Sequence, residues 1–308
     1  MKKYFLVAWA FCFVMITAIG AVWSTPLNLG PTVNSASNDS HPTIASNGAF
    51  IIFESNRPGG QGWHDLWITD YDGSVYQMPT NMGTNVNTGA EDYAPYLGVG
   101  QTRLFWCSNV AAGGFGGYDV WYCPMSGGDP GIRVNIGAGI NSVYNEVSPV
   151  VTNDGNTMYF ATDRVGTTGG YDIYTSVQSG GSWQTPTSLG NIVNSPQNEE
   201  PVWISDDGNT LVFISNRPGG SYGGLDLWYT IKGGGGWGTP INLGSPINTA
   251  NDERGATFRC NGGVIGGWMF LGSSRPGGNG GYDVWQAFES GYVKVQPQSL
   301  GIIRANFK

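Results

Sequence analysis

A carboxylate recurs once in each repeat of this chain, a few residues after an asparagine that is followed by serine or threonine. We call these residues the recurring acids: Asp39, Asp92, Glu146, Glu199 and Glu253. Carboxylates gathered around one opening would focus negative potential and attract a metal ion or a basic group. Alternatively, each acid accepts hydrogen bonds from the backbone N–H groups of its own turn. The two interpretations are compatible. No cofactor is predicted, and calcium binding at the recurring acids is left open.

The residues that follow the recurring acids differ from one copy to the next. They are His41, Ala94, Ser148, Glu200 and Arg254, with Tyr93 and Trp203 close by in the sequence. Charged and aromatic groups that vary on a common scaffold are a usual origin of a specific ligand site. In a propeller, the connections into the inner strands open at the rim of the central funnel, so we predict a ligand-binding site at this rim. Its predicted residues are Asp39, His41, Asp92, Tyr93, Glu146, Glu199, Glu200, Trp203, Glu253 and Arg254.

A second constellation pairs an arginine with an aspartate eight or nine residues later. Both are expected at the ends of neighbouring strands, where a charge-assisted hydrogen bond is reasonable. Because the pair is repeated, we predict structural ion pairs rather than catalysis. The predicted pairs are Arg57 with Asp65, Arg164 with Asp172, Arg217 with Asp226, and Arg275 with Asp283.

These residues are positioned by an internal repeat. A glycine-rich run ending in an aromatic residue occurs five times, at 55–67, 108–121, 162–174, 215–228 and 273–285. A second landmark, similar to Pro-x-x-Leu-Gly, begins at Pro26, Pro79, Arg133, Pro186, Pro240 and Pro297. Its period of roughly 50 residues suits a propeller blade and is too long for a leucine-rich or ankyrin unit.

The fourth copy shows what one repeat contains. Residues 201–205 form a short apolar strand, and 206–209 form a tight turn of the hairpin type. Residues 210–215 and 226–230 supply two further strands on either side of the glycine loop. Residues 237–243 make the outer strand, because Pro240 suits the edge of a sheet. Four antiparallel strands per repeat predict a blade of a β-propeller.

The fold class is therefore an all-β, five-bladed β-propeller of four-stranded antiparallel blades, forming one domain over residues 23–308. There are six outer-strand landmarks for five blades, so residues 23–30 are expected to add an outer strand that closes the ring. The C-terminal strand at 292–301 is the competing choice. The predicted blades are 42–83, 95–137, 149–190, 201–244 and 255–301.

The first residues indicate export. Lys2 and Lys3 precede an apolar stretch and small residues, so residues 1–22 are predicted to be a cleaved signal peptide, with a membrane anchor as the alternative. The mature chain is then periplasmic or secreted and has no transmembrane segment. The net charge of −8 argues against nucleic acid as a partner.

The run at 205–220, together with Asp226-Leu227-Trp228, resembles the WD40-like β-propeller repeat of TolB-like envelope proteins. This resemblance covers essentially all of the mature chain. It implies a periplasmic propeller that binds or scaffolds, with diverse partners. For this chain we expect an envelope protein or a glycan as the partner.

Two functions follow from these observations. We expect a binding or scaffolding module and not an enzyme. It would engage its partner at the funnel face, where the connections into the inner strands open. The alternative is a glycoside hydrolase or sialidase-like enzyme that uses funnel carboxylates, which requires two carboxyl groups at a set separation. With only His41 and His64 in the chain, a Ser-His-Asp triad is not expected.

Overall fold

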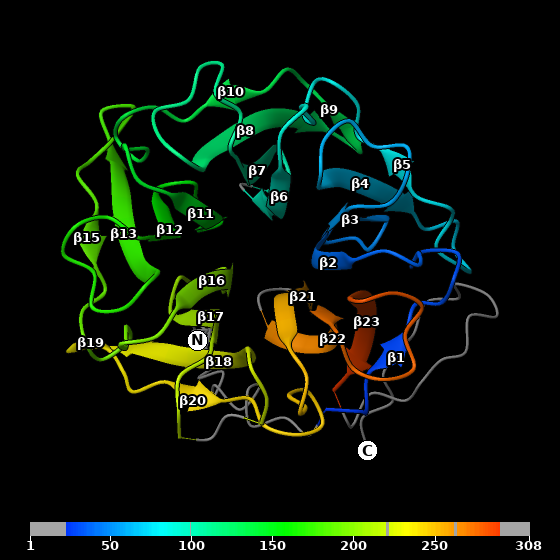
Figure 1. Ribbon diagram of the computed structural model, residues 1–308. Helices are drawn as coiled ribbons and strands as arrows, with labels where there is room; N and C mark the ends of the chain where they lie inside the picture. Colours follow the sequence, from blue (N-terminus) through cyan, green and yellow to red (C-terminus); the bar gives the residue numbers. More distant parts are fainter. Residues whose placement is uncertain (1–22, 99, 220–221, 262–263, 290–308) are drawn as a thin grey trace, which may run out of the picture.

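The computed structural model describes residues 23–289, apart from 99, 220–221 and 262–263. These residues form five antiparallel sheets arranged in a ring, and no helix is assigned among them (Figure 1). The fold is a five-bladed β-propeller, as predicted. The predicted signal peptide at 1–22 and the strand at 292–301 lie outside the described residues. No described segment is a helix long and apolar enough to cross a membrane.

Each blade runs from an inner strand at the propeller axis to short outer strands. Blade 1 comprises β2 (Asp39–Ile44), β3 (Phe50–Ser55), β4 (Asp65–Asp70) and β5 (Thr80–Asn81). Blade 2 comprises β6 (Asp92–Gly98), β7 (Arg103–Ser108), β8 (Asp119–Ser126), β9 (Asp129–Pro130) and β10 (Val134–Asn135). Blade 3 comprises β11 (Glu146–Val151), β12 (Thr157–Thr162), β13 (Asp172–Ser179), β14 (Ser182–Trp183) and β15 (Thr187–Ser188).

Blade 4 comprises β16 (Glu199–Ile204), β17 (Thr210–Ser215), β18 (Asp226–Gly233), β19 (Gly236–Trp237) and β20 (Ile241–Asn242). Blade 5 comprises β21 (Glu253–Asn261), β22 (Val264–Ser273), β23 (Asp283–Phe288) and, from the start of the chain, β1 (Leu27–Asn28). Every inner strand begins at its recurring acid, a little before the predicted blade starts. The recurring acids therefore belong to the sheets and not to the loops that lead into them.

The outer edge of a blade is less regular than the sequence suggests. In blade 4 the predicted single strand at 237–243 is two short pieces, β19 and β20, and both pair with β18. Pro240 lies between them, and it has no N–H to donate to a ladder. The outer position is thus shared by two pieces of chain in blades 2, 3 and 4.

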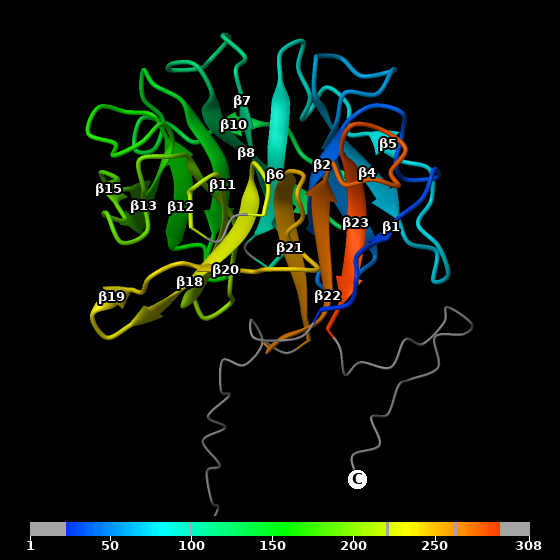
Figure 2. The same ribbon diagram turned by 60° about the horizontal axis from the view of Figure 1, so that its bottom comes forward.

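The ring is closed between the two ends of the described chain. Strand β1 lies antiparallel to β23, with Leu27 opposite Gln286 and Asn28 opposite Trp285. Figure 2 shows β21, β22 and β23 side by side, with β1 next to β23. A blade built from both ends of the chain holds the ring together and removes an open sheet edge.

Every inner strand carries an irregularity near the axis. The pairing register shifts next to the positions of His41, Ala94, Ser148, Val202 and Gly255. His41, Ala94 and Ser148 adopt positive φ angles of 47°, 51° and 52°, in the left-handed region that non-glycine residues rarely occupy. Such bulges redirect side chains, and here they lie where the inner strands surround the axis.

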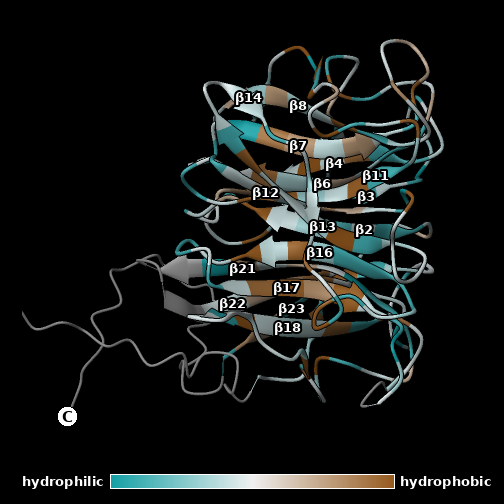
Figure 3. Cartoon of the chain, turned by 90° about the vertical axis from the view of Figure 1, so that its left-hand side faces the viewer, coloured by the Kyte–Doolittle hydropathy of each residue, from teal (hydrophilic) through white to brown (hydrophobic). Residues whose placement is uncertain are grey.

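Apolar side chains fill the spaces between adjacent blades. Phe53, Phe160 and Phe213 are fully buried on the second strands of blades 1, 3 and 4, and Trp106 is fully buried in blade 2. Hydrophobic stretches run along the stacked strands (Figure 3). Because each blade buries its face only against its neighbours, the five blades stabilise one another around the ring.

Candidate functional site

The recurring acids are buried and fully engaged within their own blades. All five have no exposed surface. Each accepts a hydrogen bond from the backbone N–H of the Ser or Thr four residues earlier, as in Ser35 N to Asp39 Oδ2 at 2.6 Å and Ser195 N to Glu199 Oε2 at 2.7 Å. These contacts agree with the turn-capping interpretation. They leave the recurring acids inside the sheets and away from the open funnel.

The arginines of the glycine loops pair with these recurring acids. Ion pairs join Arg57 to Asp39 at 2.6 Å, Arg164 to Glu146 at 3.0 Å, Arg217 to Glu199 at 3.0 Å, and Arg275 to Glu253 at 3.2 Å. The predicted pairing with Asp65, Asp172, Asp226 and Asp283 is therefore corrected. These aspartates instead accept hydrogen bonds from backbone N–H groups of the glycine loops, for example from Thr168 to Asp172 and from Tyr222 to Asp226.

In blade 4, the arginine side chain extends over two aromatic rings on its way to the inner strand. The guanidinium of Arg217 lies over Phe213 and over Trp228, at 5.0 and 5.4 Å from the ring centroids. Blade 2 has Val110 in place of the arginine. There, Trp106 Nε1 donates to Asp92 Oδ1 at 3.3 Å. Burial raises the pKa of Asp92, and hydrogen bonds from Ser108, Thr88 and Trp106 lower it only in part.

These carboxylates do not fit a calcium ion. Their oxygens accept hydrogen bonds from N–H, O–H and guanidinium groups, and they do not converge on one cavity. In the part of the chain that the structure describes, no three His, Cys, Asp or Glu side chains are arranged to hold a metal ion.

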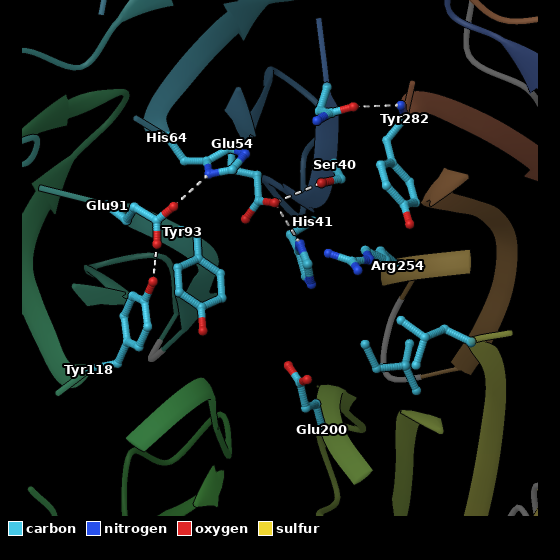
Figure 4. A pocket seen from close by; sticks show the side chains of 13 residues that line it. Ser40, His41, Glu54, His64, Glu91, Tyr93, Tyr118, Glu200, Arg254 and Tyr282 are labelled. Carbon is cyan, nitrogen blue, oxygen red and sulfur yellow. Dashed lines mark hydrogen bonds and ion pairs between the residues drawn. The ribbon is translucent and has the colours of Figure 1, made fainter. Parts of the chain in front are cut away.

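A polar cavity of about 290 Å³ lies at one end of the propeller axis. We call it the central pocket. Blades 5, 1 and 2 supply most of its polar wall, and blade 4 adds one carboxylate (Figure 4). Its polar lining includes Ser40, His41, Glu54, His64, Glu91, Tyr93, Tyr118, Glu200, Arg254 and Tyr282. Four predicted residues, His41, Tyr93, Glu200 and Arg254, therefore meet in one pocket.

A second cavity lies at the opposite end of the axis. It has a volume of about 410 Å³, and its lining includes Tyr96, Trp203, Phe258 and Asp206. Between the two cavities the axis narrows to a space of about 20 Å³ bounded by the bulged residues and the prolines that follow them. Trp203, which was predicted with the rim residues, therefore belongs to the other mouth of the propeller.

Glu54 is the most strongly held carboxylate of the central pocket. It is 5% exposed, and His41 Nδ1 lies 3.1 Å from its Oε1. Ser40 Oγ donates to Oε1 at 2.7 Å, and the backbone N–H of Ala94 donates to Oε2 at 2.9 Å. Burial raises the pKa of Glu54, but the attraction and hydrogen bond of His41, the charge of His64 and the Ala94 N–H outweigh it. The pKa is lowered to about 2.

Glu54 was not among the predicted residues, because it lies near the end of a second strand and not on the rim that precedes each inner strand. Glu54 stands in β3, one residue before the end of the strand. The equivalent residues in the other blades are Cys107, Ala161, Ile214 and Gly272. The sequence signal for Glu54 is a charged residue at a position where the four other blades have a small or apolar residue.

Glu91 marks a second departure from the repeat. Its equivalents are Asn38, Asn145, Asn198 and Asp252, each of which accepts a hydrogen bond from a backbone N–H of the preceding glycine loop. In that loop, Trp63 replaces a residue that is glycine in the four other blades: Gly117, Gly170, Gly224 and Gly281. A Cβ atom at any of these glycines would collide with the Asn or Asp side chain.

The tryptophan and the glutamate therefore belong together. Because Trp63 carries a Cβ atom where the other blades have glycine, an Asn or Asp side chain placed as in those blades would collide with it. At this border Glu91 lines the central pocket instead. There, Glu91 accepts a hydrogen bond from the Tyr118 hydroxyl and lies 3.5 Å from His64 Nδ1. Trp63 is 69% exposed, and its ring is 6.5 Å from that of His64.

Several solved propellers share this fold. The chain is similar to an endo-arabinase from Bacteroides thetaiotaomicron, with 14% identity, 88% of this chain and 98% of that chain covered, and a TM-score of 0.55. It is also similar to a thermostable family-43 glycoside hydrolase, with 13% identity, coverage of 90% and 99%, and a TM-score of 0.51. At such identities the similarity concerns the fold.

TolB from Acinetobacter baumannii is a more distant match, with 16% identity, coverage of 80% of this chain and a TM-score of 0.45. The chain spans about half of TolB, 49% of its length. TolB-like propellers are thus among the similar structures. No protein-family model matches the chain, and no curated protein matches it in sequence.

These comparisons correct the expected function. We predicted a non-enzymatic binding or scaffolding module that is not an enzyme. The endo-arabinase and the family-43 enzyme are both glycoside hydrolases, and each is matched over nearly its whole length. The hydrolase alternative is the better supported of the two.

Proposed function

We propose that this chain is a glycoside hydrolase and that its central pocket holds the scissile bond between Glu54 and Glu200. The observation that carries the proposal is the arrangement in Figure 4: the two carboxylates come from blades 1 and 4 and face each other across the pocket. Glycoside hydrolysis needs such a pair, one to protonate the leaving oxygen and one to act at the anomeric carbon. The similarity in fold to glycoside hydrolases supports the same activity.

Glu54 suits the role of the ionised carboxylate. Its contacts with His41, Ser40 and the Ala94 N–H keep it charged at any ordinary pH. A fixed negative charge stabilises the positive charge that develops on the sugar ring in the transition state. A carboxylate oxygen of Glu54 can attack the anomeric carbon or activate a water molecule, depending on its distance from that carbon.

Glu200 suits the role of the general acid. Its carboxylate accepts one hydrogen bond, from Ser148 Oγ at 2.8 Å, and its side chain is half-buried at the pocket wall. With one protein donor and access to the pocket, Glu200 is able to carry a proton to a leaving oxygen. Ser148 owes its direction to the bulge of β11, where its φ angle is 52°.

A mutational series tests this assignment. The enzyme is assayed on aryl glycosides and on polysaccharides, with Glu54→Gln and Glu200→Gln beside the wild type. Each variant should lose about 10² to 10⁴ of kcat/KM. Aryl glycosides whose leaving group needs no protonation should restore much of the rate of Glu200→Gln and none of the rate of Glu54→Gln.

Asp206→Asn is the matched control, because Asp206 is a carboxylate of blade 4 that lines the cavity at the other end of the axis. It should keep wild-type activity. Equal activity of all three variants, or no hydrolysis by the wild type on any substrate, would overturn the proposal.

The proposed substrate is a glycan encountered outside the cytoplasm. The export signal predicted at residues 1–22 and the resemblance to WD40-like repeats of envelope proteins support this location. Cell fractionation with N-terminal sequencing of the mature chain tests it. Recovery of the uncleaved chain in the cytoplasm would contradict it.

A further inference from the structure

Arg254 is the cation of the central pocket that has no acidic partner. Four arginines of the glycine loops pair with the recurring acids, whereas no Asp or Glu among the described residues lies within ion-pair distance of Arg254. Its Nε atom is buried and has no hydrogen-bond partner in the described part of the chain. A buried donor without a partner costs free energy that a suitable ligand would recover.

The guanidinium is held in position although no carboxylate forms an ion pair with it. It lies over the ring of Tyr282, 4.8 Å from the centroid, and the Tyr282 hydroxyl donates to Asp252 Oδ2 at 2.7 Å. On β22 the residue opposite Arg254 is Gly272, where a Cβ atom would collide with the backbone carbonyl of Arg254 and with Ser40. In Figure 4 the end of the Arg254 side chain points into the pocket. This fixed position reduces the entropy lost when a ligand binds.

Arg254 is the charged group of the pocket that an anionic ligand could pair with. His41 lies beside Glu54 and His64 lies beside Glu91, so these groups form two pairs. Arg254 and Glu200 remain, on different walls of the same pocket and outside ion-pair contact. A sugar lying between them would meet a carboxyl group on one side and a guanidinium on the other.

We infer that Arg254 binds the carboxylate of a uronic acid unit, so that the substrate is an acidic glycan. The planar fork of guanidinium donors matches a carboxylate with two parallel hydrogen bonds. One arginine without an acidic partner suits a monoanion better than a doubly charged phosphate. The inference rests on the proposed hydrolase function, since that function places a sugar in this pocket.

Binding measurements test the inference separately from turnover. Calorimetric titrations with Glu54→Gln use oligosaccharides of uronic acids, their carboxyl-reduced neutral counterparts and sulfated neutral oligosaccharides. The uronic acid oligosaccharides should bind best. Adding Arg254→Gln should weaken their binding by about 10- to 100-fold and leave the neutral ligands unchanged. Arg254→Lys, which keeps the charge but not the fork, should fall between the two.

Three results would overturn the inference: equal affinity for acidic and neutral oligosaccharides, equal or better binding of the sulfated ligands, or no binding of any of them. Loss of affinity for all ligands alike in Arg254→Gln would also contradict it, because the role of Arg254 would then be structural. Hydrolysis of neutral glycans by the wild type, without preference for acidic ones, would leave the hydrolase function standing and reject the acidic substrate.

Discussion

At the scale of single residues, the pocket owes its chemistry to a few departures from the repeat. Glu91 and Trp63 replace residue types that the other blades share or nearly share, and Glu54 is charged where the other blades have a small or apolar residue. His41, Ala94 and Ser148 add strained backbone that aims groups into the axis, at a cost of about 1 kcal/mol or more each. Strain and buried charge gathered at one place are typical of a site shaped by function.

The ion pair of Glu54 predicts a pH dependence of stability. In the unfolded chain Glu54 titrates near its ordinary value of 4.5, and in the folded chain near 2. Its stabilising contribution is therefore complete above about pH 4.5 and is lost as the pH falls through about 2. Denaturant unfolding of the wild type and Glu54→Gln between pH 2 and 7 measures it.

The stability difference between these two proteins should grow with pH over that window and stay constant above it. A difference that is the same at every pH would mean that Glu54 has equal affinity for protons in both states. Its proposed role as a permanently ionised carboxylate would then fail.

At the scale of the blade, an arginine joins the glycine loop to the inner strand by way of two aromatic rings. Asp39→Asn in blade 1 leaves the Arg57 guanidinium without its charge partner and should cost about 3–5 kcal/mol. Asp92→Asn in blade 2 removes a carboxylate whose pKa burial has raised and which has no arginine beside it. That change should cost only about 1–2 kcal/mol.

The two variants form a matched pair for urea unfolding at neutral pH, because they replace equivalent residues of neighbouring blades. Equal losses would show that the arginine adds nothing to the capping hydrogen bonds.

At the border between blades 1 and 2, Trp63 and Glu91 depart from the repeat, and two substitutions would restore the residue types of the other blades. The double variant Trp63→Gly, Glu91→Asn places the common residue types at both positions. We expect the free energy of unfolding to stay within about 1 kcal/mol of the wild type or to rise, because functional sites often cost stability. Activity should fall, since Glu91 no longer holds His64 and Tyr118. Undiminished kcat/KM in a stably folded double variant would exclude this border from the site.

Much of the blade could be predicted because its signals are local. Turn residues, strand composition and a fixed period define four strands without any long-range contact. The partner of Arg57 could not be predicted in this way, because Asp39 and Asp65 both stand beside Ser55 in the folded sheet, on opposite sides. Glu54 was not predicted, because its place in the pocket depends on which end of its strand faces the axis, and this is set by the fold.

At the scale of the whole molecule, the ring turns small differences between blades into one asymmetric pocket. Five equivalent strand ends meet at the axis, so residues that differ between these ends, such as Glu54 and Glu200, face each other across the pocket. Closure of the ring by β1 and β23 keeps these distances fixed. The two mouths of the axis differ, one polar with Glu54 and Glu200, the other lined by Tyr96, Trp203 and Phe258.

The central claim is that the polar mouth hydrolyses glycosidic bonds through Glu54 and Glu200. The most direct test is the release of reducing ends from a panel of acidic and neutral glycans, with the double variant Glu54→Gln, Glu200→Gln beside the wild type. We expect release by the wild type, greatest on acidic glycans, and none above background by the folded double variant. Release by the double variant at the wild-type rate, or none by the wild type from any glycan, would contradict it.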